Sequence, residues 1–116
     1  MDKKDNIIVS KTFEFAIKVI ELYKQLLSEN EFIISKQLLK SGTSIGANVE
    51  EAIAAQSRKD FVSKMSIASK EARETDYWLR LLRESNLTRI SVEYLIKDIK
   101  DIINILSKII ITTKMR

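Results

Sequence analysis

Residues 41–52 read Ser-Gly-Thr-Ser-Ile-Gly-Ala-Asn-Val-Glu-Glu-Ala, and this stretch decides the fold. Gly42 and Gly46 stand four residues apart, so on a helix they share one face. Each glycine costs about 1 kcal/mol of helix propensity relative to alanine, so two in one helix indicate that a neighbouring backbone packs closely against them. The stretch therefore predicts the most tightly packed helix of a helical bundle.

The composition of the whole chain agrees with a bundle. Its 116 residues include no proline and only two glycines, and the apolar residues recur at helical rather than alternating spacing. This length suits one domain, residues 1–116, with a core that needs no disulfide or metal. We expect an all-α, antiparallel up-down four-helix bundle.

Apolar periodicity and turn residues predict helices at about residues 6–28, 32–55, 58–85 and 91–112. Ser57 and Asp60 have the spacing of a capping box at the start of the third helix, although Asp is a weaker match than Glu or Gln. Ser91 is the predicted N-cap of the fourth helix.

The first predicted helix is apolar on two sides. One stripe comprises Val9, Phe13, Ile17, Ile20 and Leu27, and a second, nearly opposite, comprises Ile8, Phe15, Val19, Leu22 and Leu26. A monomeric bundle buries one broad face of each helix, so the second stripe needs another partner. We expect homo-oligomerisation, and an unusually wide core face is the alternative.

The third helix offers two further candidates for the oligomer interface. Ile67 and Trp78 lie about a quarter-turn away from its predicted core face. An indole outside the main apolar stripe is typical of an interface anchor, and a Trp that covers the edge of its own bundle is the alternative. The predicted interface residues are Phe15, Val19, Leu22, Ile67 and Trp78.

The residue types exclude most catalytic chemistry. The chain contains no histidine and no cysteine, which excludes most nucleophile–base pairs and most zinc sites. Glu51, Glu71 and Glu74 are the nearest approach to a carboxylate cluster for a hard cation, and ion pairs with nearby lysines and arginines are the favoured interpretation. We expect no enzymatic activity, no metal and no cofactor.

The same composition predicts a cytoplasmic protein without a membrane partner. No apolar run approaches the roughly 20 residues that span a bilayer, and the first residues are too polar for a signal peptide. The lack of cysteine fits a reducing compartment.

A row of basic residues on the third helix is the candidate binding site. It consists of Lys59, Lys70, Arg73, Arg80 and the flanking Arg83, which together form the basic row of the third helix. Such a row can follow a phosphate backbone, and Tyr77 between its members can stack on a base. The alternative is a solvated face paired with Glu74, Asp76 and Glu84. The net charge of +4 is compatible with a polyanion partner, and repetition of the row around an oligomer would strengthen its field.

Asn48 borders the inward face of the second helix. A buried amide needs a hydrogen-bond partner. We expect that partner to be Thr75 or Tyr77 of the third helix, rather than a ligand.

Three motifs carry a resemblance to a known family. They are Ser41-x-x-Ser44-Ile45-x-Ala47-Asn48-Val49-x-Glu51-Ala52, Ser57-x-x-Asp60-Phe61 and Ile67-Ala68-x-Lys70-Glu71-x-x-Glu74-Thr75-x-Tyr77-Trp78-Leu79. Over nearly its whole length the chain resembles the small bacterial four helix bundle proteins, which include proteins encoded within intervening sequences of large-subunit ribosomal RNA genes. It is also similar to the accessory variability protein of diversity-generating retroelements. A common form of the motif reads Asn-Ile-Ala-Glu-Gly, whereas here Val49-Glu50-Glu51-Ala52 follows Asn48, which indicates a subgroup.

The resemblance implies an up-down four-helix bundle that assembles as a ring, usually a pentamer, with a basic surface and no catalytic residues. The retroelement members bind nucleic acid and a partner reverse transcriptase. Together with the residues, the resemblance predicts a non-enzymatic oligomeric protein that binds nucleic acid, with RNA the favoured ligand. The alternative is an oligomeric protein–protein interaction scaffold with no nucleic-acid ligand.

Overall fold

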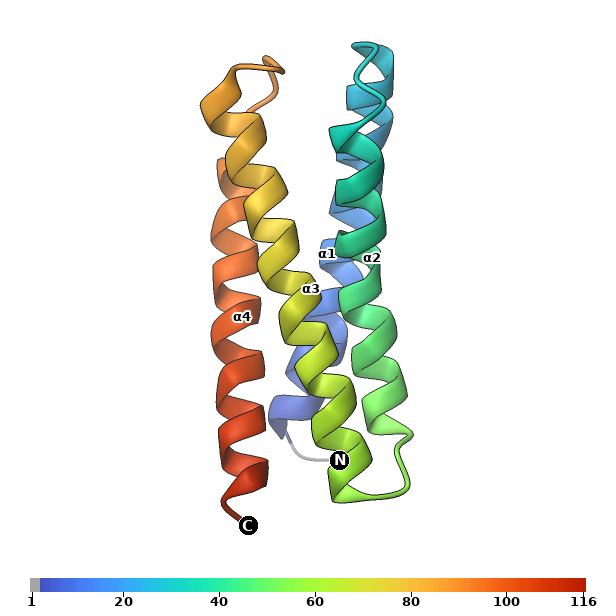
Figure 1. The fold of residues 1–116 in the computed structure, drawn as a ribbon, viewed down its shortest axis with the longest axis vertical. Helices are drawn as coiled ribbons and strands as arrows, with labels where there is room; N and C mark the ends of the chain where they lie inside the picture. Colours follow the sequence, from blue (N-terminus) through green and yellow to red (C-terminus); the bar gives the residue numbers. More distant parts are fainter. Residues whose placement is uncertain (1–2) are drawn as a thin grey trace.

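The computed structural model describes residues 3–116, with side chains from residue 7 onward. It contains four helices, which are α1 (Lys3–Ser28), α2 (Ile34–Ile53), α3 (Arg58–Ser85) and α4 (Glu93–Lys114). They run alternately up and down, as Figure 1 shows, in a body of 47 × 20 × 19 Å. Within the described residues each helix contacts its two neighbours and not the diagonal one, so α1 lies across from α3 and α2 across from α4. This arrangement confirms the predicted all-α, antiparallel four-helix bundle.

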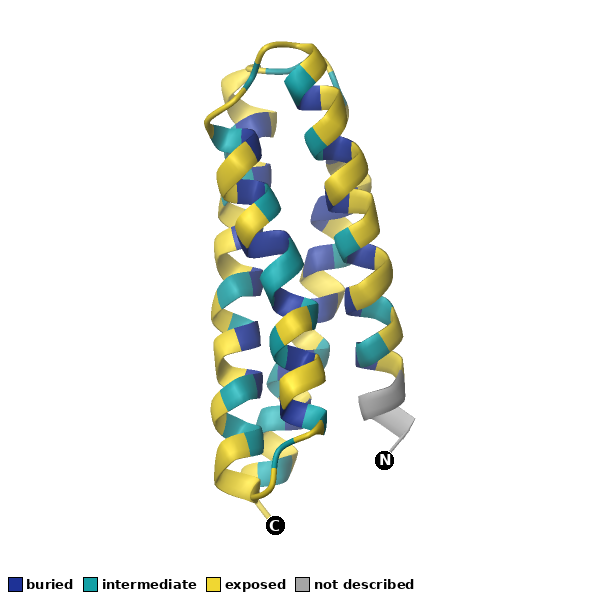
Figure 2. Ribbon diagram, turned by 90° about the vertical axis from the view of Figure 1, so that its right-hand side faces the viewer, coloured by how far each residue is buried: buried dark blue, intermediate teal, exposed yellow. Residues whose placement is uncertain are grey.

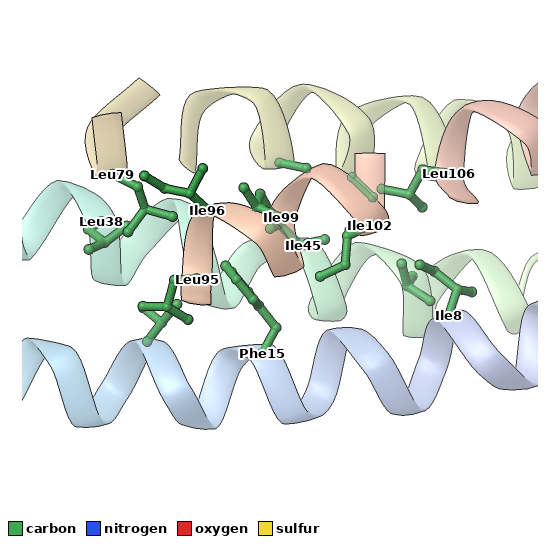
Figure 3. Packing of buried hydrophobic residues seen from close by; sticks show 14 of the residues in the cluster. Ile8, Phe15, Leu38, Ile45, Leu79, Leu95, Ile96, Ile99, Ile102 and Leu106 are labelled. Carbon is green, nitrogen blue, oxygen red and sulfur yellow. The ribbon is translucent and has the colours of Figure 1, made fainter. Parts of the chain in front are cut away.

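One long core fills the space between the helices. Each helix turns a buried face inward and an exposed face outward (Figure 2). Figure 3 shows side chains from all four helices meeting there, among them Phe15, Ile45, Leu79 and Ile99. Burial of these apolar side chains is the main favourable contribution to the stability of the fold.

The structure reverses the predicted roles of the two apolar stripes on α1. Phe15, Val19 and Leu22 are at most 2% exposed and belong to the core, so they cannot contact a second copy and that prediction is wrong. Phe13 and Ile17, from the other stripe, are 62% and 48% exposed. The physical reason is regular packing, because the buried stripe follows the alternating four- and three-residue steps that keep a seam facing its partners in a bundle.

Gly42 allows α1 and α2 to approach closely. A Cβ atom on Gly42 would lie 2.9 Å from both Cγ atoms of Val19, which is closer than real Cβ contacts. A Cβ atom on Gly46 would lie 3.4 Å from the carbonyl and hydroxyl oxygens of Thr12, at the edge of ordinary van der Waals contact. The sequence-based prediction of close packing against this helix is therefore confirmed at Gly42.

A buried hydrogen bond joins α2 to α3. The Thr75 hydroxyl lies 2.9 Å from the Ser41 hydroxyl, and both residues are buried. Asn48 does not take part, because its side-chain amide donates to the Ser44 carbonyl within α2 at 2.9 Å. The predicted contact of Asn48 with Thr75 or Tyr77 is therefore wrong, and the smaller Ser41 makes the link between the helices.

Glu31 caps the start of α2. Its carboxylate accepts hydrogen bonds from the backbone amides of Ile33, Ile34 and Ser35 at 3.1, 2.9 and 2.6 Å. These amides have no partner within the helix, so the carboxylate replaces the water they would otherwise need. Burial opposes ionisation of this carboxylate, but the amide donors outweigh it and lower the pKa of Glu31 below its ordinary value.

Two predicted caps have different outcomes. Ser57 accepts a hydrogen bond from the Asp60 amide at 3.0 Å at the start of α3, which confirms the predicted cap. The predicted Ser91 cap is wrong, since α4 begins at Glu93 and its N-cap residue, Val92, makes no side-chain hydrogen bond. The Val92 carbonyl instead accepts the first backbone bonds of α4, so the helix begins later than its sequence predicts.

The two glycines of α2 provide a matched test of the close approach. We expect Gly42→Ala to lower the free energy of unfolding by about 1–3 kcal/mol, because overpacking against Val19 exceeds the gain of about 1 kcal/mol in helix propensity. Gly46→Ala has room for its methyl group and should raise the free energy of unfolding by up to about 1 kcal/mol. Urea denaturation measures both, and equal stabilisation by the two alanines would contradict the close approach at Gly42.

Glu31 gives a pH-dependent test. Since its folded pKa is lowered, its contribution to stability is present above the unfolded pKa and is lost as the pH falls through the folded pKa. Glu31→Gln should therefore cost about 1 kcal/mol near neutral pH, and the difference from wild type should shrink towards about pH 2. Urea denaturation across a pH series measures this, and a difference that stays constant with pH would exclude the charged cap.

Candidate nucleic-acid interface

The basic row of the third helix, the α3 basic row, lies on the outer surface of α3, and all of its members are exposed. Lys59, Lys70 and Arg73 form no ion pair with any residue that the structure describes. Their charges therefore remain open to a ligand. Because they project from the middle and the first turns of one long helix, their spacing is set by the helix itself.

The other two members of the row are already paired. The Arg80 Nε donates to Asp76 at 3.1 Å. Arg83 contacts Glu84 at 2.6 Å and Glu93 of α4 at 3.3 Å, and the hydrogen bonds to these carboxylates raise the pKa of Arg83. The interpretation of a face paired with acidic residues therefore holds for Arg80 and Arg83, while the free end of the row begins at Arg73.

An aromatic pair borders the row. The rings of Tyr77 and Trp78 meet edge to face with centroids 5.2 Å apart, and the Arg80 guanidinium lies 6.0 Å from the Tyr77 centroid. The Trp78 indole donates to Glu74 at 3.1 Å. Tyr77 is about half exposed, and its ring contacts Trp78 edge to face with the Arg80 guanidinium near one side, so a base stacking on it would compete with Arg80.

Two α4 lysines missed by the sequence analysis extend the basic surface. The Arg83–Glu93 contact marks the flank of α4 that faces α3, and Lys100, Ser107 and Lys114 follow Glu93 at seven-residue steps. Residues at that spacing stay on one side of a helix. The opposite flank faces α1, because Asp98 pairs with Lys18 at 2.8 Å. The seven-residue series is visible in the sequence, but it indicates a shared surface only once α4 is known to lie beside α3.

Asp76 is a largely buried acidic side chain of α3 close to the basic row. Its side chain is 17% exposed, and one carboxylate oxygen binds Arg80. The other oxygen, Oδ1, is buried and has no hydrogen-bond partner among the described residues. Arg80 is therefore the cation that pairs with Asp76.

The carboxylates considered for a metal are separated in the structure. Glu51 pairs with Lys64 at 3.1 Å, and Glu74 accepts the Trp78 indole. Among the described residues no three carboxylates gather closely enough to hold a metal ion. In that same part of the chain, no helix has the length and apolar content needed to cross a membrane.

One group of exposed apolar side chains lies on α1, away from the α3 basic row. Phe13, Ile17 and Ile20 face outwards, and α1 is diagonal to α3 in the bundle. Ile67 on α3 is 38% exposed and Trp78 is half-buried, so these two predicted interface residues do reach the surface. The apolar group on α1 is thus separate from the α3 basic row, whereas Ile67 and Trp78 lie on the same helix as that row.

Comparisons with known proteins agree with the resemblance carried by the motifs. Residues 4–108 match the sequence profile of a family described as 23S rRNA-intervening sequence protein. The bundle is also similar to the crystal structure of a protein with unknown function from the S23 ribosomal protein family of Bacteroides thetaiotaomicron. The two chains are 50% identical and superpose with a TM-score of 0.86, over 92% of this chain and 97% of the other. No curated protein matches this chain.

Proposed function

Because the chain belongs to the 23S rRNA-intervening sequence protein family, we propose that it is a non-enzymatic protein of the bacterial cytoplasm that binds nucleic acid, preferentially RNA. The observation that carries this proposal is the set of exposed cations Lys59, Lys70 and Arg73 on one face of α3, none of which pairs with a residue that the structure describes.

Binding is electrostatic. Each phosphate held by a lysine or arginine releases condensed counterions, so affinity falls steeply as the salt concentration rises. Arg80 joins the site when a phosphate competes with Asp76 for its guanidinium, since their ion pair is exposed to solvent on the Arg80 side. Contacts of this kind position a phosphate backbone without reading base sequence.

The protein acts as a homo-oligomer in this proposal, as a ring and most simply a pentamer, in line with the family resemblance. Phe13, Ile17 and Ile20 supply the apolar contact in place of the buried stripe of α1. Large apolar side chains that gather on one exposed helix face are typical of protein–protein interfaces. A ring repeats the α3 basic row, so the fields of the copies add.

An oligomeric scaffold without a nucleic-acid ligand is the second candidate. The partial exposure of both Ile67 and Trp78 on α3 favours it, because aromatic and apolar anchors dominate the binding energy of protein interfaces. A partner that remains bound in a pull-down after nuclease treatment would support this candidate. A partner that is lost with the nucleic acid would support the first.

Charge reversal tests the α3 basic row. We expect the double variant Lys70→Glu, Arg73→Glu to weaken binding of a structured RNA at least about tenfold and to reduce the salt slope by about 2 per bound protomer. Fluorescence anisotropy across a salt series measures both quantities. The matched control is Lys36→Glu, Lys40→Glu on α2, which makes the same change in charge on exposed residues of a different helix. Equal losses in the two variants would mean that only net charge matters and would contradict a site on α3.

Sedimentation tests the oligomer. We expect wild-type protein to sediment as an oligomer and the double variant Phe13→Glu, Ile17→Glu to sediment as a folded monomer, because buried carboxylates without partners oppose association. Circular dichroism confirms that the variant keeps its helices. A wild-type protein that sediments as a monomer at all concentrations would overturn the proposed assembly.

A further inference from the structure

We propose that the nucleic-acid site spans the groove between α3 and α4, and that the ligand is double-helical RNA. This inference rests on the proposed function, because it names the form of nucleic acid that the same surface takes. The two adjacent helices together are called the α3–α4 seam here, and the residues that carry the inference are Lys59, Ser66, Arg73 and Arg80 on α3 and Lys100, Ser107 and Lys114 on α4.

Contacts at both ends of the seam set its register. Arg83 contacts Glu93 at 3.3 Å at one end, and the Arg58 guanidinium donates to the Arg116 carbonyl at the other. Between these ends the helices run antiparallel, so each step along α3 is matched by the opposite step along α4. Asp76 therefore lies level with Lys100, which brings Lys100 close to Arg73 and Arg80 across the groove.

The seam presents two rows of cations. On α3, Lys59, Arg73 and Arg80 fall on one seven-residue series, and on α4 Lys100 and Lys114 fall on another. Seven residues advance a helix by about 10.5 Å, and packed helix axes lie about 8–10 Å apart. Lys100 and Lys114 are exposed and form no ion pair within the described part of the chain. The two rows thus run along neighbouring helices, and Lys59, Arg73, Lys100 and Lys114 are available to bind phosphates on two strands, while Arg80 must first leave Asp76.

The aromatic content of the seam argues against a single strand. Proteins that bind single strands combine a basic groove with exposed aromatic rings on which bases stack. Tyr77 is the aromatic residue beside the α3 row, and its ring is already engaged by Arg80 and Trp78. A double helix keeps its bases stacked inside and offers only its backbone and grooves, so it needs no such ring.

Three serines between the cations favour RNA over DNA. The hydroxyls of Ser66, Ser69 and Ser107 form no hydrogen bond with another residue of the described chain, and Ser66 is fully at the surface. Duplex RNA is recognised through its shape, its phosphates and the 2′-hydroxyl groups that line its shallow minor groove. A serine hydroxyl both donates and accepts, so it can pair with a 2′-hydroxyl that DNA lacks.

The first experiment compares ligands with the wild-type protein. The probes are a 20-base-pair RNA duplex, an unpaired RNA strand of the same total charge and a DNA duplex of the same sequence, at one fixed salt concentration. We expect the RNA duplex to bind at least about tenfold more tightly than either of the others. Equal or tighter binding of the single strand would overturn this inference while leaving the proposed function in place. If none of the probes binds near 50 mM salt, the proposed function fails as well.

The second experiment tests the α4 row directly. Lys100→Glu, Lys114→Glu should weaken binding of the RNA duplex at least about tenfold, whereas the control Lys36→Glu, Lys40→Glu should not. Lys100→Gln, Lys114→Gln removes the charges without adding repulsion and should show a smaller loss in the same direction, with helix content by circular dichroism as the check on folding. If the α4 variants bind like wild type while Lys70→Glu, Arg73→Glu does not, the site lies on α3 alone and the two-row inference is wrong.

Discussion

The contact between Gly42 and the methyl groups of Val19 is the constraint on which the rest of the structure depends. It brings the backbones of α1 and α2 together. This close approach faces the stripe of α1 that contains Phe15, Val19 and Leu22 towards the core. Ser41 directly precedes Gly42, and its hydroxyl accepts a hydrogen bond from the Thr75 hydroxyl of α3. This bond holds α3 against the other side of α2. Small residues on one turn of α2 thus hold two neighbours at close range, and α4 closes the bundle on the far side.

Ion pairs between helices explain how a chain with a net charge of only +4 presents basic surface on particular helices. Asp98 is engaged by Lys18, Glu51 by Lys64 and Glu93 by Arg83, so acidic side chains near the helix contacts are neutralised by cations at the same borders. Among the described residues without an ion pair, Lys59, Lys70 and Arg73 project from α3, and Lys100 and Lys114 project from α4. Helices in a packed bundle hold their surface residues at fixed spacing. The positive charges of these lysines and arginines therefore lie in rows along the helices.

The candidate site was only partly predictable from the sequence. Lys59, Lys70 and Arg73 share a helix, and helical spacing alone places them on one side of it. Helical spacing does not show which cations lack an ion pair. Arg80 and Arg83 follow the same spacing and yet are paired with Asp76 and Glu93. The contribution of α4 was not predictable at all, since the proximity of two helices depends on how the whole bundle closes.

The sequence by itself determined the features that depend on neighbours within a few residues. These are the helical class, the span of α3, the Ser57 cap and the need for close packing at Gly42. Only the tertiary structure decided which apolar stripe of α1 is buried, that Ser41 rather than Asn48 bonds α3, and which lysines of α4 lie beside the α3 basic row. The physical reason is that periodicity reports an apolar face but not its partner, and partners are chosen by packing between segments far apart in the chain.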